Sequence, residues 1–127
     1  MNRMVPVIKD EREQQPIPSA WRSTFHDIIQ AFAEGDFALA RGISGVRPVS
    51  AQDAAQFPRT LHAYGARLVG LPVAGWDSSV CQWYGDYWDV MIDLYTVEEG
   101  ASDLVLGARV YENGVAFEFE VGMLYVP

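Results

Sequence analysis

Residues 78–126 constrain the fold most strongly, because four extended segments follow one another there with only short turns between them. The segments are 78–83, 87–96, 103–111 and 115–126. The last turn is Asn113-Gly114, a pair that favours the type I′ turn of a two-residue hairpin. A parallel crossover needs a dozen or more residues, so each segment must pair antiparallel with the next. We therefore predict a four-stranded antiparallel meander sheet.

A first amphipathic helix is predicted ahead of these strands. Apolar residues recur at helical spacing from Trp21 to Phe32 and form one stripe. Ser19 is the expected N-cap, because its hydroxyl can accept a hydrogen bond from a free backbone N–H. Gly35 is the expected C-cap, because glycine tolerates the left-handed conformation.

A second helix is predicted from Ser50 to Tyr64, followed by Gly65. Ser50 and Asp53 have the spacing of a capping box, and Pro58 predicts a kink or a restart of the helix. Between the two helices, residues 36–49 are compatible with a third short helical turn followed by extended chain. Helices followed by consecutive strands indicate the α+β class, with two or three N-terminal helices packed on one face of the sheet.

Chain length and cysteine content indicate one intracellular domain. A chain of 127 residues is the size of a single domain, which we place at 19–127, and the polar, proline-punctuated residues 1–18 are expected to be a flexible lead-in. Cys81 is the only cysteine, so an internal disulfide is excluded. The N-terminal residues have no apolar stretch of signal-peptide length, which favours the cytoplasm.

The chain is acidic, and its negative charge is confined to one part. Nine Lys and Arg against 17 Asp and Glu give a net charge of −8. Residues 49–127 hold three arginines and eleven acids and account for all of it. Such a segment repels nucleic acid and anionic membranes, so neither is an expected partner. It attracts a basic protein.

Alternation along the strands divides their side chains between two faces. One face is apolar and is expected to pack on the first helix; on the last strand it includes Phe119, Val121, Met123 and Tyr125. The opposite face collects carboxylates and becomes a concave acidic site if the sheet curves toward it. The candidate binding residues are Asp89, Asp93, Glu118, Glu120 and Arg109, with Trp83 and Tyr87 as aromatic anchors.

This acidic face allows several interpretations. Clustered carboxylates can act as general acid and base, can bind a hard cation, or can contact a basic protein surface. An ordinary solvated sheet face is also polar. His26 and His62 have no metal-ligand partner at helical spacing, and the chain has no phosphate-binding loop or hydrolase elbow. We therefore predict no cofactor, metal or catalytic residue, and a non-enzymatic role is favoured over an enzymatic one.

Short motifs occur along the chain from about Pro18 to the end. They are Trp21-Arg22, Gly35-Asp36-Phe37, Tyr64-Gly65, Leu71-Pro72, Val80-Cys81-Gln82-Trp83, Trp88-Asp89-Val90, Thr96-Val97-Glu98-Glu99-Gly100, Ser102-Asp103-Leu104 and Tyr125-Val126-Pro127. As a set they resemble a family of small bacterial proteins that carry a domain of unknown function. This resemblance implies no established activity. The order of elements also resembles the NTF2-like cone fold.

Two functional hypotheses follow. The first is an acidic protein-binding protein, such as an immunity-type inhibitor of a basic toxin, which binds through the acidic face. The alternative is an NTF2-like pocket protein that binds a small molecule or performs simple acid–base catalysis with Asp89, Asp93, Tyr95 and Arg109. The alternative requires an apolar cavity between the sheet and the first helix. The oligomeric state is left open.

Overall fold

The computed structural model describes residues 4–127 and has an α+β architecture. Its five strands form one antiparallel sheet in the order β1-β2-β3-β4-β5. The elements are β1 (Gln15–Pro16), α1 (Ser19–Ala33), α2 (Ala51–Tyr64), the 3-10 helix η1 (Val73–Asp77), β2 (Val80–Trp83), β3 (Trp88–Thr96), β4 (Gly100–Asn113) and β5 (Ala116–Tyr125).

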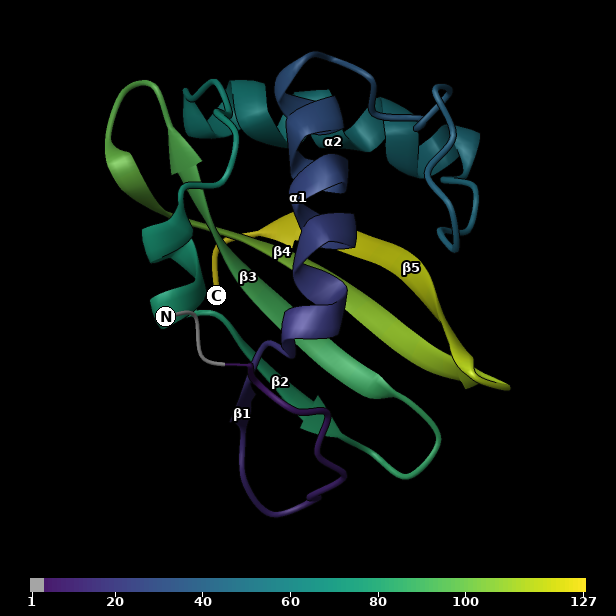
Figure 1. Ribbon diagram of the computed structural model, residues 1–127. Coiled ribbons are helices and arrows are strands. Elements are labelled where there is room, and N and C mark those ends of the chain that lie inside the picture. Colours follow the sequence, from purple (N-terminus) through teal and green to yellow (C-terminus); the bar gives the residue numbers. More distant parts are fainter. Residues whose placement is uncertain (1–3) are drawn as a thin grey trace.

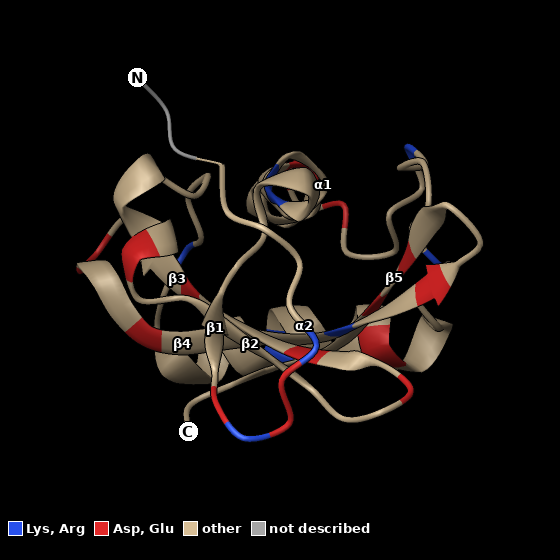
Figure 2. Cartoon of the chain, turned by 60° about the horizontal axis from the view of Figure 1, so that its bottom comes forward, with Lys and Arg blue, Asp and Glu red and all other residues tan. Residues whose placement is uncertain are grey.

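The sheet is curved, and α1 lies inside the curve. Figure 1 shows α1 in front of the sheet and α2 across its upper end. Figure 2 shows the sheet from below as a shallow cradle with α1 on its concave side. The concave side is therefore occupied by a helix. The other side, which we call the outer face, is the convex one.

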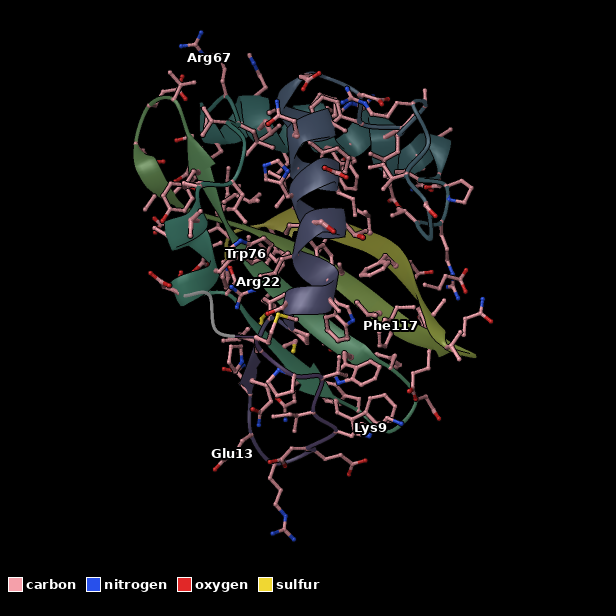
Figure 3. All side chains as sticks on the ribbon, in the orientation of Figure 1. Lys9, Glu13, Arg22, Arg67, Trp76 and Phe117 are labelled. Carbon is pink, nitrogen blue, oxygen red and sulfur yellow. The ribbon has the colours of Figure 1, made fainter. Side chains whose placement is uncertain are left out.

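The core fills the space between α1 and the sheet. On α1, Trp21, Phe25, Ile28 and Ile29 have no exposed surface, and the inward residues of β3 and β4 are at most 5% exposed. Full burial of each large apolar side chain contributes about 1.5–3 kcal/mol. Figure 3 shows Phe117 of β5 beside the first turns of α1, where its ring lies 5.5 Å from that of Trp21. The predicted inward sets are Trp88, Val90, Ile92 and Leu94 of β3, and Leu104, Leu106, Ala108 and Val110 of β4; all are buried.

Ser50 and Gly65 cap α2 as predicted, whereas the C-cap of α1 is Glu34, one residue before the predicted Gly35. The Ser50 hydroxyl accepts a hydrogen bond from the Asp53 N–H at 3.1 Å, and Gly35 and Gly65 adopt the predicted left-handed conformation. Ser19 is not the N-cap, however. It is the first residue of α1, and its hydroxyl accepts a hydrogen bond from the Val5 N–H at 2.7 Å.

Two of the alternatives that the sequence left open, a restart at Pro58 and a third helix in residues 36–49, do not occur in this part of the structure. The helix α2 continues through Pro58 without a restart. Residues 36–49 form turns rather than a third helix, and the chain then runs beside β5, where Val46 pairs in parallel with Phe119. Two backbone hydrogen bonds hold it, from Arg47 N–H to the Phe119 carbonyl and from Phe119 N–H to the Gly45 carbonyl, both at 2.8 Å.

The expected lead-in contacts the body of the protein. β1, which the four-strand prediction omits, pairs Gln15 with Cys81 and makes the fifth strand. The Trp88 indole donates a hydrogen bond to the Ile8 carbonyl at 3.0 Å, and Ile17 is fully buried. A two-residue strand carries no alternation, so no periodic signal marks it in the sequence. Residues 1–3 of the expected lead-in lie outside the described range.

A bulge in β5 changes the predicted faces of its last residues. Ala108 pairs with Val121, but Gly107 pairs with Met123, so Gly122 is an extra residue without a partner. Such a bulge reverses the alternation beyond it. Leu124 therefore joins the core at 6% exposure, and Met123 is 56% exposed. The assignment of Met123 and Tyr125 to the apolar inner face was wrong, because both residues lie beyond the bulge.

Candidate functional site

The outer face carries the predicted carboxylates on two strands, β3 and β5. Gln82, Asp89, Arg109 and Glu120 stand in register from β2 to β5 and form one row across the sheet. Glu118 lies two residue pairs further along β5, opposite Tyr111. The structure thus brings Asp89, Arg109, Glu118 and Glu120 together on one surface. This surface is convex, so the curvature needed for a concave acidic site is absent.

Most of these carboxylates are neutralised by arginines. Arg109 lies 3.4 Å from Asp89. Arg47 binds Glu118 at 2.6 Å and Glu120 at 2.8 Å. The charges along this surface therefore alternate in sign. Arg47 belongs to it, but strand alternation could not predict this, because Arg47 lies outside the strands. It reaches the face because residues 45–47 run along the edge of β5.

Both arginines also lie over tyrosine rings. The Arg47 guanidinium is 4.3 Å from the centroid of Tyr111, and the Arg109 guanidinium is 4.3 Å from that of Tyr87. A guanidinium over an aromatic face is attracted by the ring quadrupole. The outer face thus binds two of its own guanidinium groups with the same combination of a carboxylate and a tyrosine.

The ion pairs shift the pKa values of their members. The hydrogen bonds to Glu118 and Glu120 raise the pKa of Arg47, so it stays charged at every accessible pH. The hydrogen bond from Arg47 lowers the pKa of Glu118 below its ordinary value of 4.5. The folded state therefore binds the Glu118 proton less tightly than the unfolded chain does.

This shift predicts an acid-dependent contribution to stability. A lowered folded-state pKa stabilises the fold above the unfolded value, and the contribution is lost as pH falls through the lower folded value. We expect the Glu118 pKa to rise toward 4.5 in Arg47→Gln, with a smaller loss of stability between neutral and acidic pH than in wild type. Carboxyl ¹³C titration by NMR measures the pKa. An unchanged Glu118 pKa in the variant would contradict this assignment.

A depression with a glycine floor lies next to the charge row. It has a volume of about 380 Å³ and is open to solvent. Met91, Gly107 and Met123 stand in register across its middle, in the row next to Asp89 and Arg109. Because Gly107 has no side chain, the backbone of β4 is accessible between the two methionines. Its lining is Gln14, Gln82, Tyr84, Asp89, Val90, Met91, Gly107, Ala108, Arg109, Glu120, Gly122, Met123 and Tyr125.

A second, more polar depression adjoins the first and contains Asp93. Its volume is about 460 Å³, and Asp103, Tyr95 and residues 126–127 also line it. Within residues 4–127, no ion pair and no side-chain hydrogen bond engages the carboxylate of Asp93 or of Asp103. Asp93 is thus the one predicted acid whose charge is not balanced by a neighbouring cation.

The two predicted aromatic anchors lie on different sides of the sheet. Tyr87 lies on the outer face beside Tyr111 and Arg109. Trp83 packs on Trp88 with ring centroids 4.4 Å apart and lies under Lys9, so it belongs to the inner side. Tyr84 is 53% exposed and is the aromatic that lines the depression.

Several residues of this surface were not among the predicted binding residues, although strand alternation places Met91 and Gly107 on the same face as the acids. Met91 and Tyr125 lie in the predicted strands, but a methionine or a tyrosine in a strand belongs to no binding motif. Gly107 and Gly122 do give a signal, because a glycine inside a strand indicates a bulge or a close approach of backbones. A Cβ atom on Gly122 would lie 2.9 Å from the Gly107 carbonyl oxygen, which leaves no room for a side chain.

The described chain offers few groups for metal or thiol chemistry. Across residues 4–127, no three His, Cys, Asp or Glu side chains converge as a metal site would require. Burial raises the pKa of Cys81 to about 11, so its thiol is protonated at neutral pH. In the same range no helix has the length and apolarity needed to cross a membrane.

Comparison with known families gives one match. A family model described as a domain of unknown function (DUF7668) matches residues 29–127, well over half of the chain. The chain belongs to the DUF7668 family. The predicted resemblance to a family with a domain of unknown function is therefore confirmed. The DUF7668 match begins within α1 and includes every outer-face residue from Arg47 to Tyr125, but it leaves out Trp21 and the residues before α1.

Two further comparisons identify no related protein. No curated protein matches the chain, and no solved structure matches it. The bacterial origin and the likeness to the NTF2-like fold stay predictions.

Proposed function

We propose that this DUF7668 protein is a protein-binding module that recognises a basic partner through the outer face of its sheet. The observation that carries this proposal is the apolar depression beside Met91, Gly107 and Met123, open to solvent on a face that has excess negative charge. An immunity-type inhibitor of a basic toxin is the specific form of this function that the small size and the acidity favour.

Exposed apolar side chains on this face support a binding role. Met123 is 56% exposed and Tyr84 is 53% exposed, and Met91 and Tyr125 line the same depression. Methionine is flexible and polarizable, so it adapts to the shape of a partner, and tyrosine is enriched at the energetic centres of interfaces. Neither α1 nor α2 contributes a residue to the lining of the two depressions.

The charge of the face favours a basic partner. Around the two depressions and the charge row, five carboxylates against two guanidinium groups leave a net charge of −3 (Asp89, Asp93, Asp103, Glu118 and Glu120 against Arg47 and Arg109). Complementary charge increases the association rate and selects against acidic competitors. The net charge of −8 on the whole chain acts in the same direction.

The alternative, a pocket protein with a cavity between α1 and the sheet, receives less support. That space is filled by Trp21, Phe25, Ile28 and Phe32 from α1, each at most 2% exposed. A small-molecule site on this chain would have to use the outer face instead.

Co-purification from cells of the source organism tests the proposal. Tagged wild type, Asp89→Asn/Asp93→Asn and the control Asp27→Asn/Asp53→Asn would be compared at low ionic strength and at about 1 M salt, where the Debye length is about 3 Å. The control removes the same charge from the two helices. We expect a basic protein in stoichiometric amount with wild type and control. Its recovery should fall about tenfold or more with the outer-face variant and with salt.

Two results would overturn the proposal. One is the absence of any stoichiometric partner at low salt. The other is equal recovery with Asp89→Asn/Asp93→Asn and with the control, because the outer face would then make no contribution to binding.

A further inference from the structure

We propose that the glycine-floored depression binds an arginine side chain of the partner protein. This inference rests on the proposed function, and it assigns a specific occupant to the site. The aliphatic stem would lie over Gly107 between Met91 and Met123, and the guanidinium would reach Asp89 and the ring of Tyr84 or Tyr125.

The shape of the depression fits a long, thin side chain. Gly107 has no side chain between two methionines of the neighbouring strands, since the three residues stand in register, and the Tyr125 ring borders the space above it. Methionine walls and a glycine floor match the three methylene groups of an arginine stem. Arginine commonly buries this stem and keeps its charged end in a polar setting.

The chemistry at the rim fits a guanidinium. Oδ1 of Asp89 lies 3.4 Å from Arg109 Nε, and among the described residues no hydrogen bond is donated to its Oδ2. Tyr84 and Tyr125 line the depression, and no arginine or lysine of the described chain lies over either ring. A carboxylate oxygen and an aromatic face are therefore both available.

The protein itself shows that this surface can hold guanidinium groups. Arg47 and Arg109 each lie 4.3 Å from a tyrosine centroid and beside at least one carboxylate. A third guanidinium in the depression would repeat that arrangement with residues that are still unused. Arginine is favoured over lysine because its planar group can stack and hydrogen-bond at the same time.

Arg109 lines the depression and would repel an incoming cation, but the surrounding charge outweighs it. The lining contains Asp89 and Glu120 against Arg109 alone, and Asp93 and Asp103 lie at the adjoining depression. The net charge around the depression is therefore negative, which favours a cationic side chain over a neutral one of the same shape.

An NMR titration with a single capped amino acid tests this inference without the partner. The probe is Nα-acetyl-L-arginine N-methylamide, and Nα-acetyl-L-citrulline N-methylamide is the uncharged control of nearly the same shape. We expect the arginine probe to shift the amide signals of Met91, Gly107 and Met123 with a dissociation constant of roughly 1–10 mM, as suits a ligand of its size. The citrulline probe should bind at least about tenfold more weakly, because its hydrogen bond to Asp89 lacks the positive charge of a guanidinium group.

Variants locate the site within the sheet. Gly107→Val fills the floor and should abolish the arginine-induced shifts, while Ala116→Val, which also introduces a valine but at the exposed start of β5, should leave them unchanged. If Gly107→Val does not fold, Met123→Ala removes one wall at an exposed position and should weaken binding of the probe.

Several results would overturn the inference: equal binding of the citrulline probe, shifts spread over all acidic surfaces, or normal binding to the variant that fills the floor. Tighter binding of free L-arginine than of the capped probe would also overturn it, because the ligand would then be a metabolite. The proposed function is tested separately, by the co-purification experiment. If the partner still binds Gly107→Val, the arginine site is excluded and the protein-binding role stands.

Discussion

Trp21→Ala is expected to lower the free energy of unfolding by about 3–5 kcal/mol, the range for removal of a large aromatic side chain from a core. Trp21 is fully buried, and its ring packs edge-on against Trp88 at 5.2 Å and Phe117 at 5.5 Å. Alanine would leave a cavity at the point where α1 packs on β3 and β5. Urea denaturation followed by far-UV circular dichroism measures the change.

Two further variants make the Trp21 result specific. The Trp21 indole N–H is buried and has no hydrogen-bond partner within the described chain, so Trp21→Phe removes an unsatisfied donor and should cost clearly less than Trp21→Ala. Val73→Ala, at a position that is 83% exposed, should change stability by no more than about 0.5 kcal/mol. A Trp21→Ala effect as small as that of Val73→Ala would show that the packing of α1 on the sheet is not as described.

Gly122→Ala is expected to destabilise the protein by about 1–3 kcal/mol, as overpacking does. Its added Cβ would lie 2.9 Å from the carbonyl oxygen of Gly107, which is backbone and cannot move aside without distorting β4. The bulge at Gly122 also sets which side Met123 and Leu124 face. Loss of its geometry should therefore disturb the depression as well as stability. Thermal unfolding and ¹H–¹⁵N NMR spectra together measure both effects.

Gly107→Ala is the matched control for the bulge variant. Its Cβ would lie 3.2 Å from Cε1 of Tyr125 and 3.5 Å from Cγ of Met123, and both are side-chain atoms that can shift. Alanine also costs less chain entropy than glycine, so stability should change by less than about 1 kcal/mol. If both alanine variants had the same stability, the close contact between Gly122 and Gly107 would be absent in solution.

The meander and both helices were predictable because each depends on a local signal. The tight hairpin between β4 and β5 forms as predicted, but its two loop residues are Gly114 and Val115 rather than Asn113 and Gly114, and Asn113 lacks the positive φ of a type I′ turn. Ser50 and Gly65 mark the ends of α2 by their own backbone chemistry. The inward residues of β3 and β4 followed from a strict period of two. The positions of Asp89, Arg109, Glu118 and Glu120 on one face followed in the same way.

The remaining features depend on contacts that are distant in sequence. Arg47 is 71 residues from Glu118, and residues 45–47 reach β5 through only two backbone hydrogen bonds. Beyond the bulge at Gly122, the residues of β5 face the opposite side of the sheet. A strict alternation that ignores the bulge therefore assigns Met123 to the wrong face. The depression and the ion pairs of the charge row can therefore be recognised only in the folded structure, where the register of the strands is known.

Site-specific photo-crosslinking in cells of the source organism tests most directly whether the outer face is the binding surface. p-Benzoyl-L-phenylalanine would replace Met123 on the outer face and, as the control, Gln56 on the exposed side of α2. We predict a covalent adduct with one basic protein from position 123 and none from position 56. Adducts from position 56 alone, or from neither position, would contradict the assignment of the outer face as the surface that binds a partner.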